Sequence, residues 1–240
     1  AKRPVILCDA MKNWKAIKRW TPAYLKKTCG SEIVEITAGR NQNQLYEMQM
    51  EKHVRSLPFG EYVDMVSSGE QTNDYYMVAR NNFFMRPGVK PLLEDMEIFP
   101  EYLDPNNKGD GFYMWYGPKG TITPLHQDML NIFMAQVRGH KRIKIIPASE
   151  FDLLYNHDGV YSLVDCENPD YRRFPRYRHA TVIDVDLAPG EVLFLPIGWW
   201  HHVRALDTSI TVSFTNFLFP NSYSWAHPKP RNGAGSNANT

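Results

Sequence analysis

A histidine and an aspartate two positions apart, in the stretch TITPLHQD (residues 121–128), are the first side chains that could do chemistry. On a β-strand, residues i and i+2 project to the same side, so His126 and Asp128 would point together while Gln127 points away. Such a pair can clamp a divalent metal. It can equally be a buried histidine–carboxylate hydrogen bond, or a catalytic base with the group that orients it. For so short a motif alone, the hydrogen-bonded pair is the stronger interpretation.

Two adjacent histidines later in the chain make the metal interpretation stronger. The stretch APGEVLFLPIGWWHHVRAL (188–206) combines a glycine turn, an apolar strand, a Pro–Gly turn and then His201 and His202 at the start of another strand. A histidine from a neighbouring strand would complete a two-histidine, one-carboxylate set, which non-haem Fe(II) oxygenases use with other metal positions left open. Alternation along a strand lets only one of the two histidines point inward, and it does not say which. The other would face outward with a structural role.

Other metal chemistries fit the sequence less well. Structural zinc sites use closely spaced Cys and His ligands, whereas Cys8, Cys29 and Cys166 form no CxxC motif. The chain has no HExxH motif, and a three-histidine cupin site would need HxH where this chain has HQD. The hard carboxylate of Asp128 favours Fe(II) or Mn(II) over a softer metal. The scattered cysteines indicate reduced thiols and therefore a cytoplasmic protein.

The elements that must position these residues change character near the middle of the chain. Short runs rich in β-branched and aromatic residues, separated by Gly- and Pro-bearing turns, predict a β-sandwich or barrel over residues 111–225. Residues 1–110 mix helix and strand patterns, so we expect an N-terminal α/β part within one domain of residues 1–225, followed by a flexible tail at 226–240. The predicted elements are a strand at 4–10, a strand running into a loop at 74–84, helices at 22–30, 57–69 and 148–155 with Thr21 and Ser149 as caps, a short helix at 90–99, and a long loop at 165–180.

A lysine at a predicted turn is a candidate anion partner. Gly139 would turn the run 131–137 into the run 141–147 as an antiparallel hairpin. Lys141 would then begin a strand beside the metal clamp, and its long stem could carry a cation into the barrel. The alternative is a solvated hairpin lysine, which is the default for an isolated Lys, and Arg138 and Arg142 compete as anion partners.

Composition excludes several classes of function. The formal net charge is +1, so no global electrostatic attraction to nucleic acid or to a membrane surface is expected. No apolar run approaches the roughly 20 residues of a membrane-spanning helix. The expected partners are therefore a protein, peptide or small-molecule substrate, and the oligomeric state is not predicted.

Several motifs in order resemble one family. The stretches TPLHQD, NIFMAQVRGHKRIKIIP, VDCENPDYRRFP and PGEVLFLPIGWWHHVRALDTSITVSFTNF are similar to JmjC-domain, cupin-like 2-oxoglutarate oxygenases, over residues 4–225. The likeness looks closest to small bacterial members, related to the asparaginyl hydroxylase of hypoxia-inducible factor and to arginyl-hydroxylase-like JmjC proteins. The resemblance implies a mostly β fold with flanking helices: a double-stranded β-helix (jelly-roll) core with an N-terminal α/β extension.

The resemblance also implies a cofactor set and its ligands. It assigns Fe(II) to His126, Asp128 and the first histidine of the pair, His201, which are then also the catalytic residues. The activity implied is hydroxylation of a C–H bond with O2 and 2-oxoglutarate as cosubstrates. The 2-oxoglutarate site maps to Lys141, for the distal carboxylate, and to four further residues: Thr123, Tyr76, Trp115 and Asn131. Asn131 lies one position nearer the aspartate than in the asparaginyl hydroxylase.

The substrate is where the sequence leaves most alternatives open. Family precedent favours a protein or peptide side chain, and the loop at 165–180, with Tyr171, Arg172 and Arg176, could grip an extended peptide or an acidic ligand. A solvated basic loop is the plainer interpretation of the same residues. A small-molecule or natural-product substrate, methyl-lysine demethylation, a non-catalytic cupin-like binding protein and a cupin enzyme without 2-oxoglutarate are the alternatives.

Overall fold

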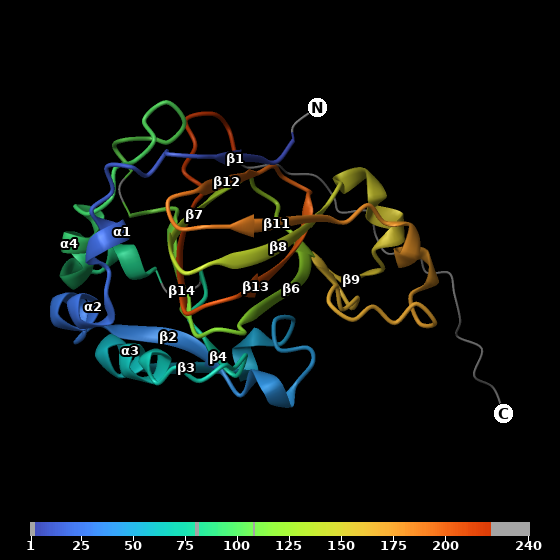
Figure 1. The fold of residues 1–240 in the computed structure, drawn as a ribbon, viewed down its shortest axis with the longest axis horizontal. Coiled ribbons are helices and arrows are strands. Elements are labelled where there is room, and N and C mark those ends of the chain that lie inside the picture. Colours follow the sequence, from blue (N-terminus) through green and yellow to red (C-terminus); the bar gives the residue numbers. More distant parts are fainter. Residues whose placement is uncertain (1–2, 80–81, 108, 222–240) are drawn as a thin grey trace.

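Two antiparallel sheets packed face to face form the centre of the molecule (Figure 1). The computed structural model describes residues 3–79, 82–107 and 109–221, so the predicted tail at 226–240 lies outside the described residues. The five-stranded sheet has the order β1 (Val5–Leu7), β12 (Val192–Leu195), β7 (Ile132–Arg138), β14 (Ser209–Phe214) and β5 (Phe112–Gly117). The six-stranded sheet has the order β11 (Ile183–Leu187), β8 (Lys141–Ile146), β13 (Trp200–Ala205), β6 (Ile122–Gln127), β10 (Tyr161–Ser162) and β9 (Asn156–Asp158). The predicted fold, mostly β with a jelly-roll core, is confirmed.

The N-terminal α/β part covers one side of this core (Figure 1). A small sheet of order β3 (Val54–Pro58), β2 (Ile33–Ala38) and β4 (Tyr75–Tyr76) lies with four helices, α1 (Ala16–Arg19), α2 (Pro22–Cys29), α3 (Phe59–Ser67) and α4 (Lys90–Leu93). Short 3-10 turns at Arg40–Gln42, Met50–Lys52, Phe83–Met85 and Pro87–Val89 link them. Trp14 and Trp20 share one buried cluster with Phe112 and Phe214, so the two parts bury a common core. None of the helices in the described ranges is long and apolar enough to span a bilayer.

The helices predicted at 22–30 and 57–69 are confirmed as α2 and α3, whereas the helix predicted at 90–99 is shorter than expected. Helix α2 begins as predicted: Thr21 Oγ1 accepts a hydrogen bond from Tyr24 N at 3.3 Å, and Pro22 is the first helical residue. The strand running into a loop that is predicted at 74–84 is confirmed: the strand is Tyr75–Tyr76, and a later 3-10 turn buries Phe83 and Phe84. The helix predicted at 90–99 ends after four residues, since the following segment takes Met96 and Phe99 into the core.

The predicted hairpin between residues 131–137 and 141–147 is wrong. Strand β7 pairs with β12 and β14, whereas β8 pairs with β11 and β13, so the turn at Gly139 carries the chain from one sheet to the other. Gly139 has a φ of 67°, and a Cβ there would lie 2.3 Å from the carbonyl oxygen of Thr208. Only glycine fits this crossing, because it accepts the left-handed conformation and lets the two backbones approach closely.

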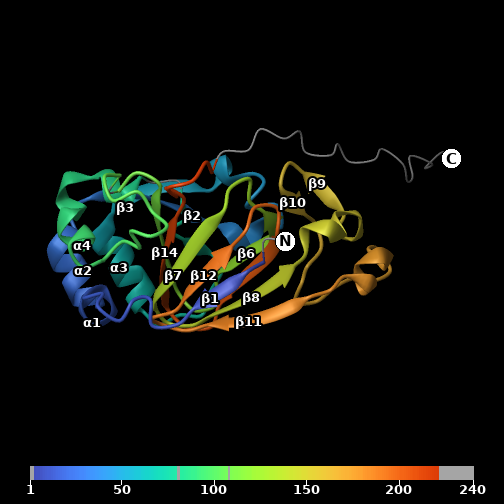
Figure 2. The same cartoon turned by 90° about the horizontal axis from the view of Figure 1, so that it is seen from above.

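A lobe of residues 148–182 covers the outer face of the six-stranded sheet at one end of the barrel (Figures 1 and 2). Its side chains, among them Phe174 and Tyr177, pack on Leu125, Ile146 and Trp200 of the sheet. The helix predicted at 148–155 is a broken 3-10 helix at Ala148–Leu153, without a side-chain cap from Ser149. The predicted long loop at 165–180 contains a 3-10 turn at Pro175–His179.

Candidate metal centre

Three ligand-type side chains meet at the mouth of the barrel. Strands β6 and β13 are neighbours in register, with His201 paired to His126, so the two imidazoles lie side by side with ring centroids 4.0 Å apart. Asp128 follows β6, and its Oδ2 lies 3.6 Å from His201 Nε2. Each of the three residues offers a ligand atom within 4.8 Å of the others. Two ligands that bind one first-row metal at about 2.1 Å lie roughly 3–4 Å apart, so the arrangement suits a shared ion with small side-chain adjustments.

The register of β13 decides which histidine of the pair points inward. His201 is opposite Ile145 of β8, and Val203 is opposite Ile143; both partners belong to the cluster between the sheets. His202 is opposite Lys144, whose ammonium bonds an exposed Asp184 on the outer face. Because successive residues of a strand face opposite sides, His201 points into the barrel and His202 away from it. His202 is nevertheless buried, because the lobe covers that face.

Hydrogen bonds fix the imidazoles in the state that a metal needs. His126 Nδ1 lies 2.8 Å from the carbonyl oxygen of Pro124, and His201 Nδ1 lies 3.2 Å from that of Trp199. A carbonyl only accepts, so both Nδ1 atoms carry the proton and both Nε2 lone pairs are free for a ligand bond. Burial lowers the pKa of His201 well below its usual range, which keeps the ring neutral.

The carboxylate of the set is the most accessible of the three ligands. The side chain of Asp128 is 36% exposed, against 3% for His201. Desolvation raises the pKa of the Asp128 carboxyl, and the nearby imidazole of His126 opposes that rise. A divalent ion would remove the desolvation cost by supplying the missing positive charge. Two neutral imidazoles and one carboxylate are the donor set that Fe(II) and Mn(II) accept, so the residues fit the predicted metal.

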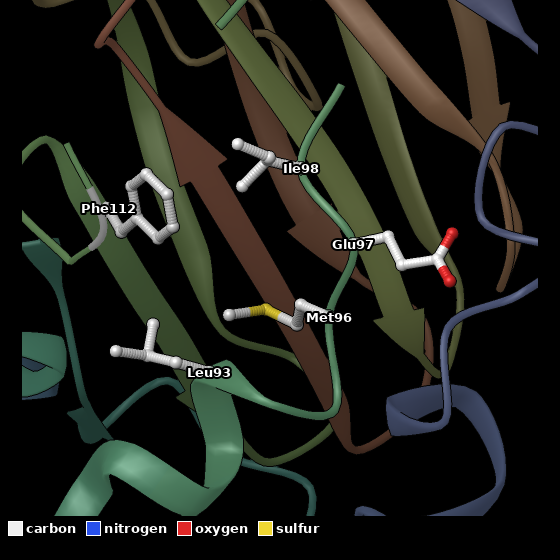
Figure 3. A pocket seen from close by; sticks show the side chains of 5 residues that line it. All are labelled: Leu93, Met96, Glu97, Ile98 and Phe112. Carbon is white, nitrogen blue, oxygen red and sulfur yellow. The ribbon is translucent and has the colours of Figure 1, made fainter. Parts of the chain in front are cut away.

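A cavity of about 410 Å³ is lined by two of the three ligands, His126 and Asp128. Its wall includes Trp115 and Thr123 of the predicted 2-oxoglutarate site, and Tyr161, whose ring stacks on His126 at 5.8 Å. The remaining lining residues come mostly from the segment after β2 and the lobe: Glu47, Met48, Met50, Glu51, Val78, Ala79 and Val160. A second hollow of about 290 Å³ lies near α4; four apolar side chains face it, and the carboxylate of Glu97 points away from them (Figure 3). Only the first cavity adjoins ligating groups.

Lys141 is a buried cation without an acidic partner among the described residues. It is 2% exposed, and Nζ donates a hydrogen bond of 3.0 Å to the hydroxyl of Tyr76. Burial lowers the pKa of Lys141 to about 7 and raises that of Tyr76, which therefore stays protonated. Lys141 lies on β8, next to the strand of His201, as its partner Ala205 on β13 shows. A buried ammonium with only a neutral partner is a site prepared for an anion.

The structure separates the other predicted cosubstrate residues. Thr123 lies on the cavity wall, and Trp115 lies there with its ring 5.9 Å from that of Tyr76 and its Nε1 bonded to Ser213 Oγ at 2.9 Å. Asn131 does not line the cavity. Its Oδ1 accepts a bond from Ile197 N at 3.1 Å, and its Nδ2 donates to Asn221 Oδ1 at 2.8 Å. These bonds tie the turn before β13 to the end of the described chain, so the geometry gives Asn131 a structural part.

The predicted substrate residues lie apart from the cavity. Tyr171, Arg172 and Arg176 are exposed on the lobe, and none is among the residues that line the space beside the metal ligands. The lobe itself reaches the cavity through Val160 and Tyr161. A direct role of the three residues at the reacting group therefore stays a prediction that this geometry does not support.

A buried ion pair at the cavity wall is not predicted by the sequence. Arg40 Nη2 bonds Glu47 Oε1 at 3.0 Å and the carbonyl oxygen of Ile122 at 2.6 Å, with both charged side chains almost fully buried. The guanidinium lies over the rings of Tyr46, at 4.3 Å, and Tyr76, at 5.3 Å. Burial raises the pKa of Glu47, and Arg40 opposes that rise. No motif marks this pair in the sequence, because it forms between a turn and an irregular segment.

Comparison with known proteins agrees with this architecture. A family model described as "Cupin-like domain" matches residues 1–222. The chain belongs to the cupin-like domain family. It is 32% identical over 220 residues to "Lysine-specific demethylase 8" of Xenopus tropicalis, covering 89% of this chain and 48% of that protein. It is 32% identical over 230 residues to "JmjC domain-containing protein D" of Dictyostelium discoideum, covering 87% of this chain and 50% of that protein. It is 26% identical over 236 residues to "HSPB1-associated protein 1" of Homo sapiens, covering 90% of this chain and 48% of that protein.

The comparisons confirm part of the predicted family resemblance. The cupin-like and JmjC elements of the prediction are confirmed by the family match and by relatives with JmjC in their names. The bacterial type and the kinship with the asparaginyl hydroxylase stay predictions. This cupin-like chain spans about half the length of the curated relatives it matches.

Proposed function

We propose that this cupin-like chain is an Fe(II)- and 2-oxoglutarate-dependent dioxygenase that hydroxylates a C–H bond of a protein or peptide side chain. The observation that carries the proposal is the pairing of two features in one barrel. The metal-ligand set of His126, Asp128 and His201 lies at the cavity, and the unpaired cation of Lys141 is buried on the strand beside that of His201. An enzyme that binds a metal alone has no need of the second feature.

When bound, iron and 2-oxoglutarate supply the oxidising power that inserts one oxygen atom of O2 into a C–H bond, while the cosubstrate becomes succinate and CO2. The residues of this chain would position the reactants and keep water out. His126 and His201 would bind through Nε2 and Asp128 through its carboxylate, all from one side. Positions on the other side of the ion would then face the cavity.

Lys141 and Tyr76 would hold the distal carboxylate of 2-oxoglutarate. The ammonium supplies the counter-charge, and the hydroxyl of Tyr76, already in contact with it, supplies a donor. Thr123, on the strand of His126, would add a hydroxyl at the same carboxylate. Trp115 would form an aromatic wall beside the cosubstrate. Asn131 keeps its predicted place at this site only as a proposal, because its side chain bonds Asn221 and the backbone of Ile197.

The wall opposite the metal would select the reacting group. Met48, Met50 and Val78 make that wall largely apolar, which favours a side chain that leaves water. Glu47 adds one buried carboxylate, which Arg40 pairs at 3.0 Å. A neutral protein side chain suits this apolar part of the wall. One xenopus relative is named a lysine-specific demethylase, and demethylation is the alternative in which the hydroxylated carbon is a methyl group that then leaves as formaldehyde.

The decisive test measures succinate formed from 2-oxoglutarate with Fe(II), in a matched pair of variants. His201→Ala should remove turnover and weaken Mn(II) binding at least tenfold, because it deletes one ligand. His202→Gln, one residue along the same strand but facing the lobe, should retain both. Metal binding without succinate under any condition would favour a non-catalytic binding protein or a cupin enzyme without 2-oxoglutarate, and equal loss in both variants would refute the assigned register.

The substrate is found by mass spectrometry after the enzyme, iron and 2-oxoglutarate are incubated with a peptide or metabolite pool. A gain of one oxygen atom on a peptide supports side-chain hydroxylation, the same gain on a metabolite supports the small-molecule alternative, and formaldehyde with loss of a methyl group supports demethylation. We further propose that residues 1–225 act as one oxygenase unit in the cytoplasm. All three cysteines are free, and burial raises the pKa of the Cys29 and Cys166 thiols to about 12, which fits reduced thiols.

A further inference from the structure

A cluster of arginines occupies the surface of the lobe. We call residues 171–179, with the sequence YRRFPRYRH, the arginine loop. Its four guanidinium groups, at Arg172, Arg173, Arg176 and Arg178, are exposed. Within the described ranges none of them forms an ion pair with a carboxylate. The cluster therefore presents a surplus of positive charge on a chain whose formal charge is only +1.

The backbone of the arginine loop is held in one conformation. Asp170 Oδ1 accepts hydrogen bonds from the backbone N–H groups of Arg172, at 2.9 Å, and Arg173, at 3.1 Å. The hydroxyl of Tyr155 accepts from the N–H of Arg176 at 2.9 Å. Phe174 and Tyr177 anchor the loop in the buried cluster beneath the lobe. An ordered loop loses little conformational entropy when it binds a partner.

Three of the guanidinium groups are also held in place, each over an aromatic ring. Arg173 lies 4.9 Å from the ring of Phe174, Arg176 lies 4.6 Å from Tyr155, and Arg178 lies 5.8 Å from Tyr171. A guanidinium over a ring keeps its N–H edge outward, and that edge matches a carboxylate with two parallel hydrogen bonds. The loop is thus a row of orientated donors for anions.

The charges on the neighbouring sheet behave differently. Arg142 bonds Asp186 at 2.9 Å and Lys144 bonds Asp184 at 2.8 Å within the sheet, and Arg204 of the sheet bonds Glu167 of the lobe, so each of these cations has a carboxylate partner. Two other lobe carboxylates close to the loop in sequence, Asp165 and Asp170, instead bind backbone: Asp165 accepts from the N–H groups of residues 167 and 168, and Asp170 accepts from those of 172 and 173. The loop cations are therefore left for a partner from outside the described chain.

We propose that the arginine loop docks an acidic segment of a polypeptide. The rings beneath the guanidinium groups are already covered, so they are not free to stack on nucleic-acid bases, as single-strand binders require. The overall charge of the chain also gives no long-range attraction to a phosphate backbone. The docking itself does not depend on oxygenase activity. Its use in selecting a substrate, with acidic residues on the loop while another side chain enters the cavity, rests on the proposed function.

Binding is tested by fluorescence anisotropy with the full chain, without iron or 2-oxoglutarate. The probe is a fluorescein-labelled peptide of alternating Glu and Ser, and its matched control replaces every Glu with Gln. We expect binding of the acidic peptide alone, and a loss of affinity of about tenfold in Arg172→Gln/Arg176→Gln at roughly 0.1 M salt. The control variant Lys18→Gln/Lys27→Gln removes the same charge from exposed sites on α1 and α2, at the far side of the molecule (Figure 1), and should bind as the wild type does.

Arg172→Gln alone keeps all three ring contacts, so it tests the charge with the loop intact; we expect about a threefold loss. Thermal unfolding checks that each variant is folded. Equal affinity of wild type and loop variants, equal binding of the Gln peptide, or tighter binding of a single-stranded oligonucleotide of the same charge would each overturn the proposal. Because the assay needs no turnover, absence of oxygenase activity would leave its result unaffected.

Discussion

Raising the pH should weaken the binding of 2-oxoglutarate, because its proposed partner Lys141 loses its proton near neutrality. Burial lowers the pKa of Lys141 to about 7 in the protein without ligand. The distal carboxylate binds the charged ammonium, so the bound state keeps the proton to a much higher pH. Below pH 7 the free protein already carries the charge; above it, each pH unit costs a factor approaching ten. Between pH 6.5 and 8.5 the dissociation constant should therefore rise about 25-fold, or about 1.9 kcal/mol.

The measurement is isothermal titration of the Mn(II)-loaded protein with 2-oxoglutarate, since manganese avoids turnover. Pyruvate is the ligand control: it keeps the keto-acid end and lacks the distal carboxylate, so any pH effect on the metal itself appears with both ligands. Lys141→Arg is the protein control, because a guanidinium stays charged throughout and should remove the dependence. A dissociation constant for 2-oxoglutarate that changes no more than that for pyruvate would refute Lys141 as the anion partner and leave the metal centre standing.

Three further predictions concern stability. Lys141→Met should raise the free energy of unfolding by roughly 3 kcal/mol at pH 7 and by little near pH 10. Because the pKa of Lys141 is lowered in the folded protein, the unfolded chain binds one more proton than the folded chain between pH 7 and 10.5. The stability of the wild type therefore rises with pH across that window, and the stability of the variant does not. Gly139→Ala should cost about 2 kcal/mol or more in urea unfolding, because its Cβ would meet the Thr208 carbonyl at 2.3 Å and its φ is 67°. Glu47→Ala should cost about 3–5 kcal/mol by leaving Arg40 buried and unpaired, whereas the exposed Asp186→Ala should change the melting temperature little.

Strand alternation alone predicts part of the metal-ligand set. Spacing puts His126 and Asp128 on one side of a strand, and the structure brings both to His201. Alternation left His201 and His202 open, because it gives opposite faces to neighbours without saying which face is the core. The pairing with β8 supplies that information: the partner of His201 is a buried isoleucine, and the partner of His202 is a lysine. Apart from the family resemblance, which implied His201, only the tertiary register distinguishes the two.

The predicted hairpin at Gly139 is wrong because strands that are adjacent in sequence need not be neighbours in one sheet. A glycine between two strand-like runs predicts a hairpin, since most short connections join sheet neighbours. In a jelly roll the chain instead crosses between sheets, as it does at Gly139. The burial of Lys141 was predicted although the reason given for its position, a hairpin, was wrong. The Arg40–Glu47 pair could not be predicted, because its two members come from a segment without regular periodicity and are defined only by what packs on them.

Strand β13 joins the two functional proposals physically. His201 faces the barrel interior, while Trp200 and His202 on either side of it face the lobe, and Trp200 is fully buried beneath it. Strand β13, which carries His201, therefore also packs against the lobe that carries the arginine loop. A one-residue slip of β13 would exchange every face, turning Trp200 into the barrel and His201 toward the lobe. Packing of the lobe on Trp200 thus penalises that slip, and we infer that the lobe stabilises the metal centre as well as carrying the docking surface.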